Sequence, residues 1–187
     1  MAFFAGGATH HERLFMAANR VGKTICGAYE SALHLTGDYP DWWPGRRFTA
    51  ATNGWAAGKT SETTRDIVQL ALCGHPDRMG TGMIPADLIV DRRFKPNTNQ
   101  SLDWVSVRHV SGKNSWLGMK SYDQGRKAFE GTEKHFIWLD EEPPMPIYTE
   151  CLTRTATVNG IIFDTFTPLE GATEMVLSFM EPGIERV

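Results

Sequence analysis

Short apolar runs alternate along the chain with segments in which apolar residues recur at helical spacing. The short runs predict β-strands, and they lie at 12–18, 47–52, 102–110, 115–122, within 135–144 and within 160–171. The helically spaced segments predict helices at 23–35, at 61–74 with Ser61 as N-cap, and near 146–157, with one further helical turn at 125–131.

Strands that are apolar on both faces and alternate with helices are typical of a mainly parallel sheet covered by helices. The sequence therefore predicts an α/β fold. Ligands of such sheets bind beyond the carboxyl ends of the strands. Polar residues that directly follow a strand are the first candidates for a functional site.

Composition is consistent with one globular domain spanning 1–187. The chain has 187 residues, of which 41% are apolar and 22% charged, and its formal charge is −3. Bulk charge therefore favours neither nucleic-acid nor membrane binding, and no apolar run reaches the roughly 20 residues of a membrane span. The three cysteines lack metal-ligand spacing, although Cys73 and His75 form a possible pair, and we expect reduced, mostly buried thiols.

Two Gly-Lys-Thr triplets, at 22–24 and 58–60, raise the question of a phosphate-binding loop. The first follows a compact apolar run and precedes a long helical pattern, with four residues between Ala17 and Gly22. The second has a glycine spacing one residue short, and Trp55 would crowd a phosphate. We assign phosphate binding to the first triplet and the start of a surface helix to the second.

Two acids follow the apolar run "FIWL" at 136–139, and this position is the carboxyl end of a predicted strand. A nucleotide site needs a loop lysine, a hydroxyl on Mg²⁺, an acid that holds the metal and a group that polarises water. Asp140 is the candidate metal acid and Glu141 the candidate general base. Glu142 is expected to point to the other face of an extended chain.

Taken together, these motifs resemble the ATPase domain of the large terminase subunit of tailed bacteriophages. The resemblance rests on "FMAANRVGKT" at 15–24, "SYDQGRKAF" at 121–129, "HFIWLDEEPP" at 135–144 and "DTFTPLEG" at 164–171, in that order. It implies a P-loop NTPase of the additional-strand, catalytic-glutamate class that binds ATP and Mg²⁺. It also implies coupling roles for Thr165 and Thr167. The expected nucleotide-binding residues are Ala17, Ala18, Asn19, Arg20, Val21, Gly22, Lys23 and Thr24, with Thr24 and Asp140 on the metal and Lys23 and Glu141 in catalysis.

The arginine that neutralises transition-state charge is open between Arg20, within the loop, and Arg126, acting on a neighbouring subunit. In many relatives the loop arginine stands where this chain has Asn19. Relatives also often place the trans arginine directly before the glycine that matches Gly131, where this chain has Glu130.

The resemblance further implies a viral DNA-packaging motor in the host cytoplasm, with double-stranded DNA, the portal protein, the small terminase subunit and further copies of itself as partners and no membrane association. Basic stretches at 46–47 and 92–95 are candidate DNA contacts. No nuclease domain or nuclease activity is expected from 1–187. The alternatives are another P-loop enzyme, such as a helicase or nucleotide kinase, and an inactive nucleotide-binding or assembly module.

Overall fold

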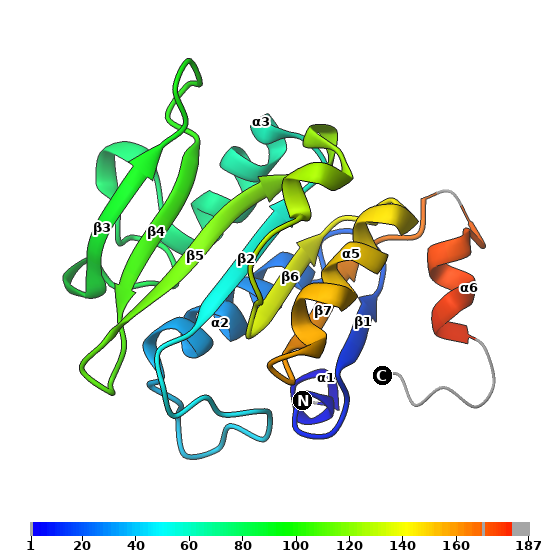
Figure 1. Cartoon of the computed structure of the whole chain (residues 1–187), viewed down its shortest axis with the longest axis horizontal. Helices are drawn as coiled ribbons and strands as arrows, with labels where there is room; N and C mark the ends of the chain where they lie inside the picture. The colour runs from blue at the N-terminus through cyan, green and yellow to red at the C-terminus, as the bar shows by residue number, and fades with distance from the viewer. Residues whose placement is uncertain (1, 170, 181–187) are drawn as a thin grey trace.

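A seven-stranded sheet forms the centre of the molecule (Figure 1), with the strand order β1-β7-β6-β2-β5-β4-β3. The computed structural model describes residues 2–169 and 171–180. The strands are β1 (Glu12–Met16), β2 (Asn53–Gly58), β3 (Ile89–Phe94), β4 (Leu102–Arg108), β5 (Asn114–Ser121), β6 (Phe136–Asp140) and β7 (Ile161–Phe166).

The five strands from β1 to β5 in spatial order are parallel, so their carboxyl ends share one edge. β7 lies between β1 and β6 and pairs with both, with Phe15 and Asp140 both opposite Thr165. The last strand in sequence is thus inserted between the strand before the Gly-Lys-Thr loop and the strand that ends in acids. This insertion defines the additional-strand arrangement, and the mainly parallel α/β prediction is confirmed.

β4 and β3 extend the sheet in the antiparallel sense beyond β5. On the outer face of this extension the indoles of Trp104 and Trp116 lie 4.7 Å apart between centroids. Trp55 on β2 lies over Gly118, where a Cβ would stand 2.9 Å from the indole. The strands predicted at 102–110 and 115–122 are confirmed as β4 and β5, and they pair with each other, whereas β3 carried no clear sequence signal.

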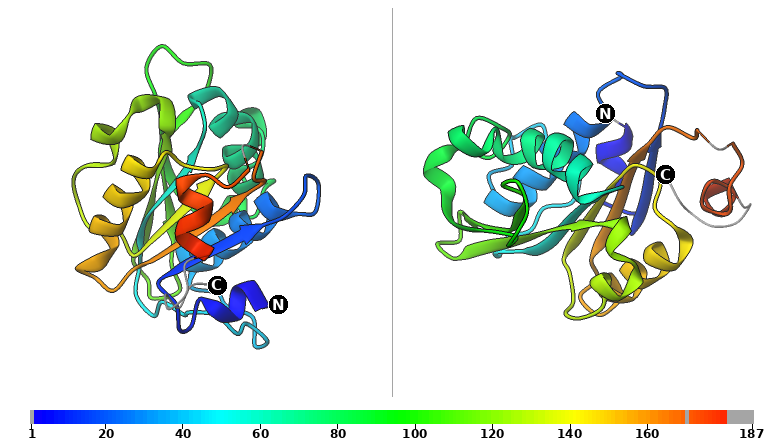
Figure 2. Two further views of the ribbon diagram at one scale, coloured as in Figure 1. Left: turned by 90° about the vertical axis from the view of Figure 1, so that its right-hand side faces the viewer. Right: turned by 90° about the horizontal axis from the view of Figure 1, so that it is seen from above.

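Helices cover both faces of the parallel part (Figure 2). Helix α2 (Lys23–Thr36) lies behind the sheet in Figure 1, and α5 (Met145–Ala156) crosses in front of β6 and β7. Short helices α1 (Ala2–Gly6) and α6 (Glu174–Met180) flank the β1 side of the fold. Predicted helices 23–35 and 146–157 are therefore confirmed.

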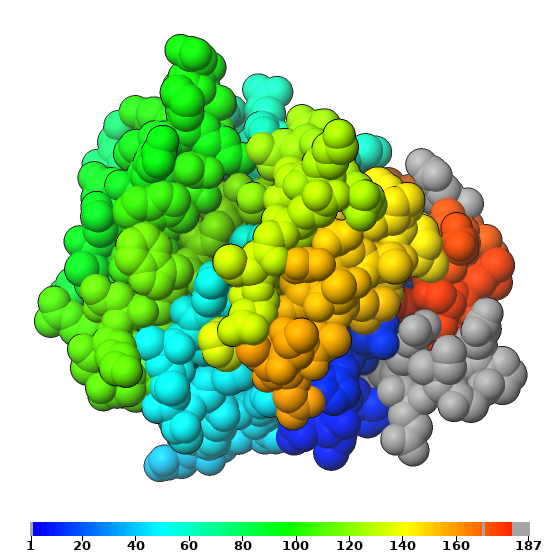
Figure 3. All heavy atoms as spheres, in the orientation of Figure 1, coloured from blue at the N-terminus to red at the C-terminus, as the bar shows by residue number. Residues whose placement is uncertain are grey.

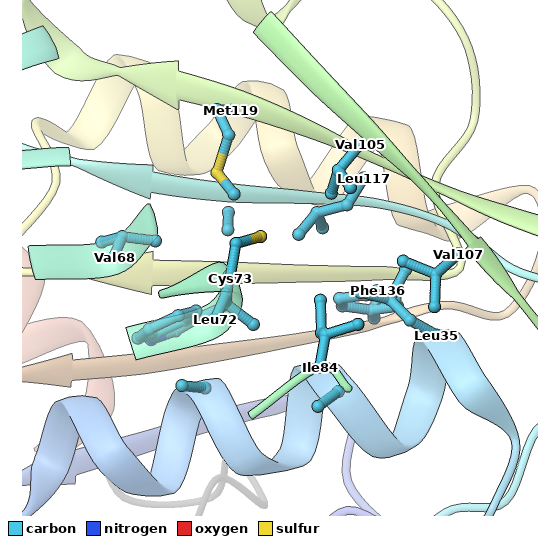
Figure 4. Close-up of a cluster of buried hydrophobic side chains, with 14 of the residues drawn as sticks. Leu35, Val68, Leu72, Cys73, Ile84, Val105, Val107, Leu117, Met119 and Phe136 are labelled. Carbon is cyan, nitrogen blue, oxygen red and sulfur yellow. The ribbon is translucent and has the colours of Figure 1, made fainter. Parts of the chain in front are cut away.

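Each face of the sheet has its own apolar core. The core beneath α2 includes Leu35, Leu72, Ile84, Val105 and Phe136, all fully buried (Figure 4). Cys73 also lies fully buried in this core. Cys151 is buried on the α5 side and Cys26 half-buried, and all three thiols are free, as expected.

The strand predicted at 47–52 is wrong, because the second strand is β2, one segment later. Glycines and alanines dominate β2 and give it little strand propensity. Packing explains the composition. A Cβ on Gly54 would stand 2.5 Å from the Phe136 ring on the next strand, so the aromatic side chain of β6 fills the space that a β2 side chain would take.

The second Gly-Lys-Thr triplet ends β2 and starts a helical segment, as predicted. This segment spans 61–73 as α3 (Ser61–Thr63), the π-helical turn η1 (Thr64–Gln69) and α4 (Leu70–Cys73). The N-cap is Thr60 rather than the predicted Ser61, since the Thr60 hydroxyl accepts from the Thr63 N–H at 3.1 Å. Ser61 instead bonds the Ser121 hydroxyl at 3.0 Å.

Candidate functional site

The loop at 17–22 connects β1 to α2 at the carboxyl edge of the parallel strands. Gly22 is the N-cap of α2 with φ of 90°, a conformation that favours glycine, and Arg20 has φ of 64°. Ala17 is not among the described non-glycine residues with positive φ, so alanine is tolerated where the usual loop has glycine. The 14-residue helix α2 thus directs its free N–H groups toward the loop, an arrangement that favours anions.

Lys23 is only 8% exposed, and its ammonium group folds back into the loop. Nζ donates to the carbonyls of Ala17 at 3.0 Å and Ala18 at 2.7 Å, and to the Thr167 hydroxyl at 2.9 Å. The Thr167 hydroxyl also lies within hydrogen-bonding distance of two loop acceptors, Ala17 O at 3.0 Å and Asn19 Oδ1 at 2.8 Å. The residue after β7 is therefore joined directly to the loop and its lysine.

Asp140 is the point at which three elements meet. Thr24, on the first turn of α2, donates to its carboxylate at 3.1 Å, and Thr165, on β7, donates at 2.7 Å. Burial raises the pKa of Asp140 to about 6, against the opposing effect of the hydrogen bonds from both threonines. The donor set of a hydroxyl and a carboxylate fits Mg²⁺, which prefers hard oxygen ligands.

The Thr165 hydroxyl is oriented by a residue that the sequence patterns did not single out. The Trp138 indole N–H donates to Thr165 Oγ1 at 2.8 Å, so the single hydroxyl proton of Thr165 is left for Asp140. Gly27 makes room for this indole, because a Cβ there would stand 2.3 Å from it. A glycine in a helix interior opposite a buried tryptophan was the available signal.

Glu141 follows β6 in a left-handed conformation, with φ of 70°. Its N–H donates to the Thr165 carbonyl at 3.1 Å. The chain is therefore not extended at this point, contrary to the geometry assumed for Glu142. Glu142 nevertheless turns away from the loop, and its carboxylate accepts from the Thr173 hydroxyl.

A cavity of about 350 Å³ lies between the loop and the acid strand. Its lining residues are Asn19, Arg20, Gly22, Lys23, Thr24, Ile25, Glu141 and Thr165. Glu141 also lines a neighbouring cavity of about 490 Å³ that includes Lys59. Val21 is exposed, and Ala17 and Ala18 contribute carbonyls to Lys23 rather than lining residues.

Arg20 and Arg126 lie in different places. Arg20 lines the loop cavity. Arg126 belongs to the turn η5 (Arg126–Phe129), which packs beside α5 (Figure 3), and it pairs with Glu150 at 2.8 Å and Glu130 at 2.9 Å. Its guanidinium is half exposed. It lines a hollow with α5 residues and not the loop cavity.

Asp164 is a buried acid outside this cluster. It alternates to the α5 face of β7, is fully buried, and neither carboxyl oxygen has a hydrogen-bond partner among the described residues. Burial, followed by the nearby Glu12 and Glu142 carboxylates, raises its pKa well above the ordinary value. The sequence motif gave no sign that this aspartate differs from its polar neighbours.

The inserted strand, the Gly-Lys-Thr loop and the acid-ended strand together define a P-loop NTPase fold. Residues 14–182 match the family described as terminase large subunit, T4likevirus-type, N-terminal, and the chain belongs to this family. The predicted resemblance is thereby confirmed.

The relatives that match are longer than this chain, which spans less than half of their length. The large terminase subunit of Salmonella phage P22 is 36% identical over 199 residues, which is 96% of this chain and 40% of that protein. The large terminase of a thermophilic bacteriophage has the same fold, with a TM-score of 0.57 at 15% identity over 85% of this chain and 34% of that one. Its complexes with ADP and with ATP-gamma-S give TM-scores of 0.55 and 0.53 at 16% and 14% identity, each over 84% of this chain and 33% and 32% of theirs.

The described residues also bear on two earlier expectations. No group of three or more His, Cys, Asp or Glu side chains there is arranged to hold a metal, so the Cys73 and His75 pair gains no further ligands. No helix in the described part of the chain is long and apolar enough to cross a bilayer. Glu170, within the motif at 164–171, lies outside the described residues.

Proposed function

We propose that this chain is a Mg²⁺-dependent ATPase domain that powers the packaging of double-stranded viral DNA. The observation that carries the proposal is the Asp140 carboxylate, held by one hydroxyl from the loop helix and one from the inserted strand. Glu141 and both of these threonines line the loop cavity. The complexes of the thermophilic phage terminase with ADP and ATP-gamma-S support nucleotide binding by this fold.

Lys23, Thr24 and Asp140 bind the nucleotide and its metal. The Lys23 ammonium exchanges its contacts with Ala17 O, Ala18 O and Thr167 for phosphate oxygens. Thr24 and Asp140 would hold Mg²⁺, which neutralises phosphate charge when bound. The loop residues 17–22 surround the phosphates with backbone groups.

Glu141 accepts a proton as water attacks the terminal phosphate, and the bond to the leaving diphosphate oxygen breaks. Thr165 and Thr167 connect this chemistry to β7, because one bonds Asp140 and the other bonds Lys23. A change in phosphate occupancy therefore alters the contacts of the segment that follows β7.

Arg20 would neutralise charge within its own site, because it lines the loop cavity. Arg126 lines a separate hollow beside α5 and would act on a neighbouring copy in a ring. Of the two candidate DNA contacts, the basic stretch at 92–95 is the stronger. Arg47 donates hydrogen bonds to three carbonyls of its own loop. Arg93 is largely exposed on β3, and its ion pair with Asp103 is long, at 3.9 Å between Nε and the carboxylate oxygen. The portal protein, the small subunit and the host cytoplasm complete the proposed setting.

Single-turnover hydrolysis of radiolabelled ATP, with protein in excess, tests this function. We expect Mg²⁺-dependent phosphate release that falls by about 10²–10⁴-fold in Glu141→Gln with nucleotide binding retained. Lys23→Ala is expected to weaken binding itself, and Lys59→Ala, in the second triplet, is the matched control.

Loss of activity in Lys59→Ala but not Lys23→Ala would contradict the choice of loop. Absence of both binding and hydrolysis in the wild type at millimolar nucleotide would instead favour an inactive assembly module. Transfer of phosphate to a nucleoside monophosphate would favour a kinase.

A further inference from the structure

We propose that Tyr122 is a positioning residue whose phenol hydroxyl holds the peptide that carries Glu141. The inference rests on the proposed ATPase function, because it concerns the aim of the general base. Tyr122 lies within the segment at 121–129 that carries part of the resemblance, but neither the motifs nor the resemblance assigns this tyrosine a role.

The contact is specific and lies at the carboxyl edge of the sheet. Tyr122 Oη donates to the carbonyl oxygens of Asp140 at 3.1 Å and Glu141 at 2.9 Å. Tyr122 directly follows β5, and β2 lies between β5 and β6 in the sheet. The ring therefore reaches across the end of β2 to the acid strand.

Glu141 needs such a tie because its backbone is left-handed, which a non-glycine residue adopts only when its surroundings impose it. Its N–H is bonded to Thr165 O on β7 at 3.1 Å, and its carbonyl is bonded to Tyr122. The two contacts come from opposite sides of β6. Without the hydroxyl, the Glu141 carbonyl loses its hydrogen bond from Tyr122, and the Glu141 carboxylate can turn away from the loop cavity.

Packing and a closed turn hold Tyr122 in place. It is buried, and its ring lies 6.4 Å from that of Phe129. The turn around it is closed by Ser121 N–H donating to Gln124 Oε1 at 3.0 Å and by Gly125 N–H donating to the Tyr122 carbonyl at 2.9 Å. Burial and the carboxylates of Asp164 and Asp140 raise the pKa of Tyr122, so the phenol keeps the proton that it donates.

Tyr122→Phe removes the hydroxyl and keeps the ring. In single-turnover ATP hydrolysis we expect the rate to fall between about 10-fold and 100-fold, because small displacements of a reacting group have effects of this size. Affinity for a fluorescent ADP analogue is expected to stay within about twofold of the wild-type value, because the hydroxyl lies outside the phosphate loop. Tyr148→Phe is the matched control, since its buried hydroxyl lies on the same side of the sheet but contacts Glu12.

Two readouts separate positioning from a general loss of stability. In a Glu141→Gln background, Tyr122→Phe should lower the residual rate by less than about twofold, because there is no carboxylate left to aim. Amide exchange in the peptide 139–144 should become faster in Tyr122→Phe and not in Tyr148→Phe. Placing 4-aminophenylalanine at position 122 restores a donor and should restore the rate.

Wild-type rates in Tyr122→Phe, or an equal loss in both backgrounds, would overturn this inference while leaving the ATPase proposal in place. A wild-type protein that binds nucleotide without hydrolysing it overturns both. If Tyr122→Phe fails to fold, the 4-aminophenylalanine variant and its exchange pattern decide, and an unrestored rate with normal folding refutes the role of the donor.

Discussion

Gly27→Ala is expected to destabilise the protein, although the same change in an ordinary helix interior is stabilising. Gly27 lies within α2, where alanine is favoured over glycine by about 1 kcal/mol. The added Cβ would stand 2.3 Å from Trp138 Cε2 and Nε1, and the indole is fully buried. The ring must therefore shift, and this shift weakens or breaks the hydrogen bond from the Trp138 indole to Thr165.

The expected magnitude follows from three opposing terms. Overpacking a core typically costs about 1–3 kcal/mol, and loss of one buried hydrogen bond costs about 0.5–1.5 kcal/mol. After the gain of about 1 kcal/mol in helix propensity, the net loss is roughly 0.5–3.5 kcal/mol. For a chain of this size each 1 kcal/mol lowers the melting temperature by about 2–4 °C.

Urea unfolding followed by circular dichroism measures this change directly. Cys26→Ala is the matched control, because it improves helix propensity one residue away on a half-buried position. Trp138→Phe in the Gly27→Ala background should recover part of the loss, since the smaller ring relieves the contact. If Gly27→Ala is more stable than the wild type by the helix-propensity gain alone, the proposed Gly27–Trp138 packing constraint is refuted.

The remaining predictions concern buried charge. Asp164→Asn should become more stable relative to the wild type as pH rises above about 4. Above that pH the unfolded wild type loses the Asp164 proton, whereas the folded wild type keeps it, because the raised pKa opposes a buried charge near Glu12 and Glu142. The stability difference should grow by up to about 1.4 kcal/mol per pH unit until the folded pKa is reached. Urea unfolding at several pH values tests this against the exposed control Asp87→Asn, and a pH-independent difference would contradict it. Arg13→Met should cost about 3–5 kcal/mol, because the fully buried Glu30 carboxylate loses the guanidinium 2.6 Å away and keeps only the contact with the His34 ring at 3.2 Å among the contacts described. Arg13→Met with Glu30→Leu should recover most of this loss, and a loss below about 1 kcal/mol for the single change argues against a charged pair.

Much of the fold and part of the site were predictable because their signals are local. Apolar runs predicted five of the strands at nearly their observed positions, and the triplet at 22–24 was recognised from the strand before it and the helix after it. β2 escaped because its glycines and alanines are explained only by Phe136 on a neighbouring strand. Thr60 replaced Ser61 as N-cap for a similar reason, since Ser61 is engaged by Ser121 from β5.

The sequence by itself determined the α/β class, the family resemblance and the pairing of a loop lysine with an acid-ended strand, because these depend on residue type and order along the chain. Only the tertiary structure decided that Thr24 and Thr165 meet on Asp140, that Trp138 orients Thr165, and that Tyr122 reaches the Glu141 peptide. These contacts join residues far apart in sequence across neighbouring strands. Such contacts depend on strand order and register, which a single sequence does not encode as a local pattern.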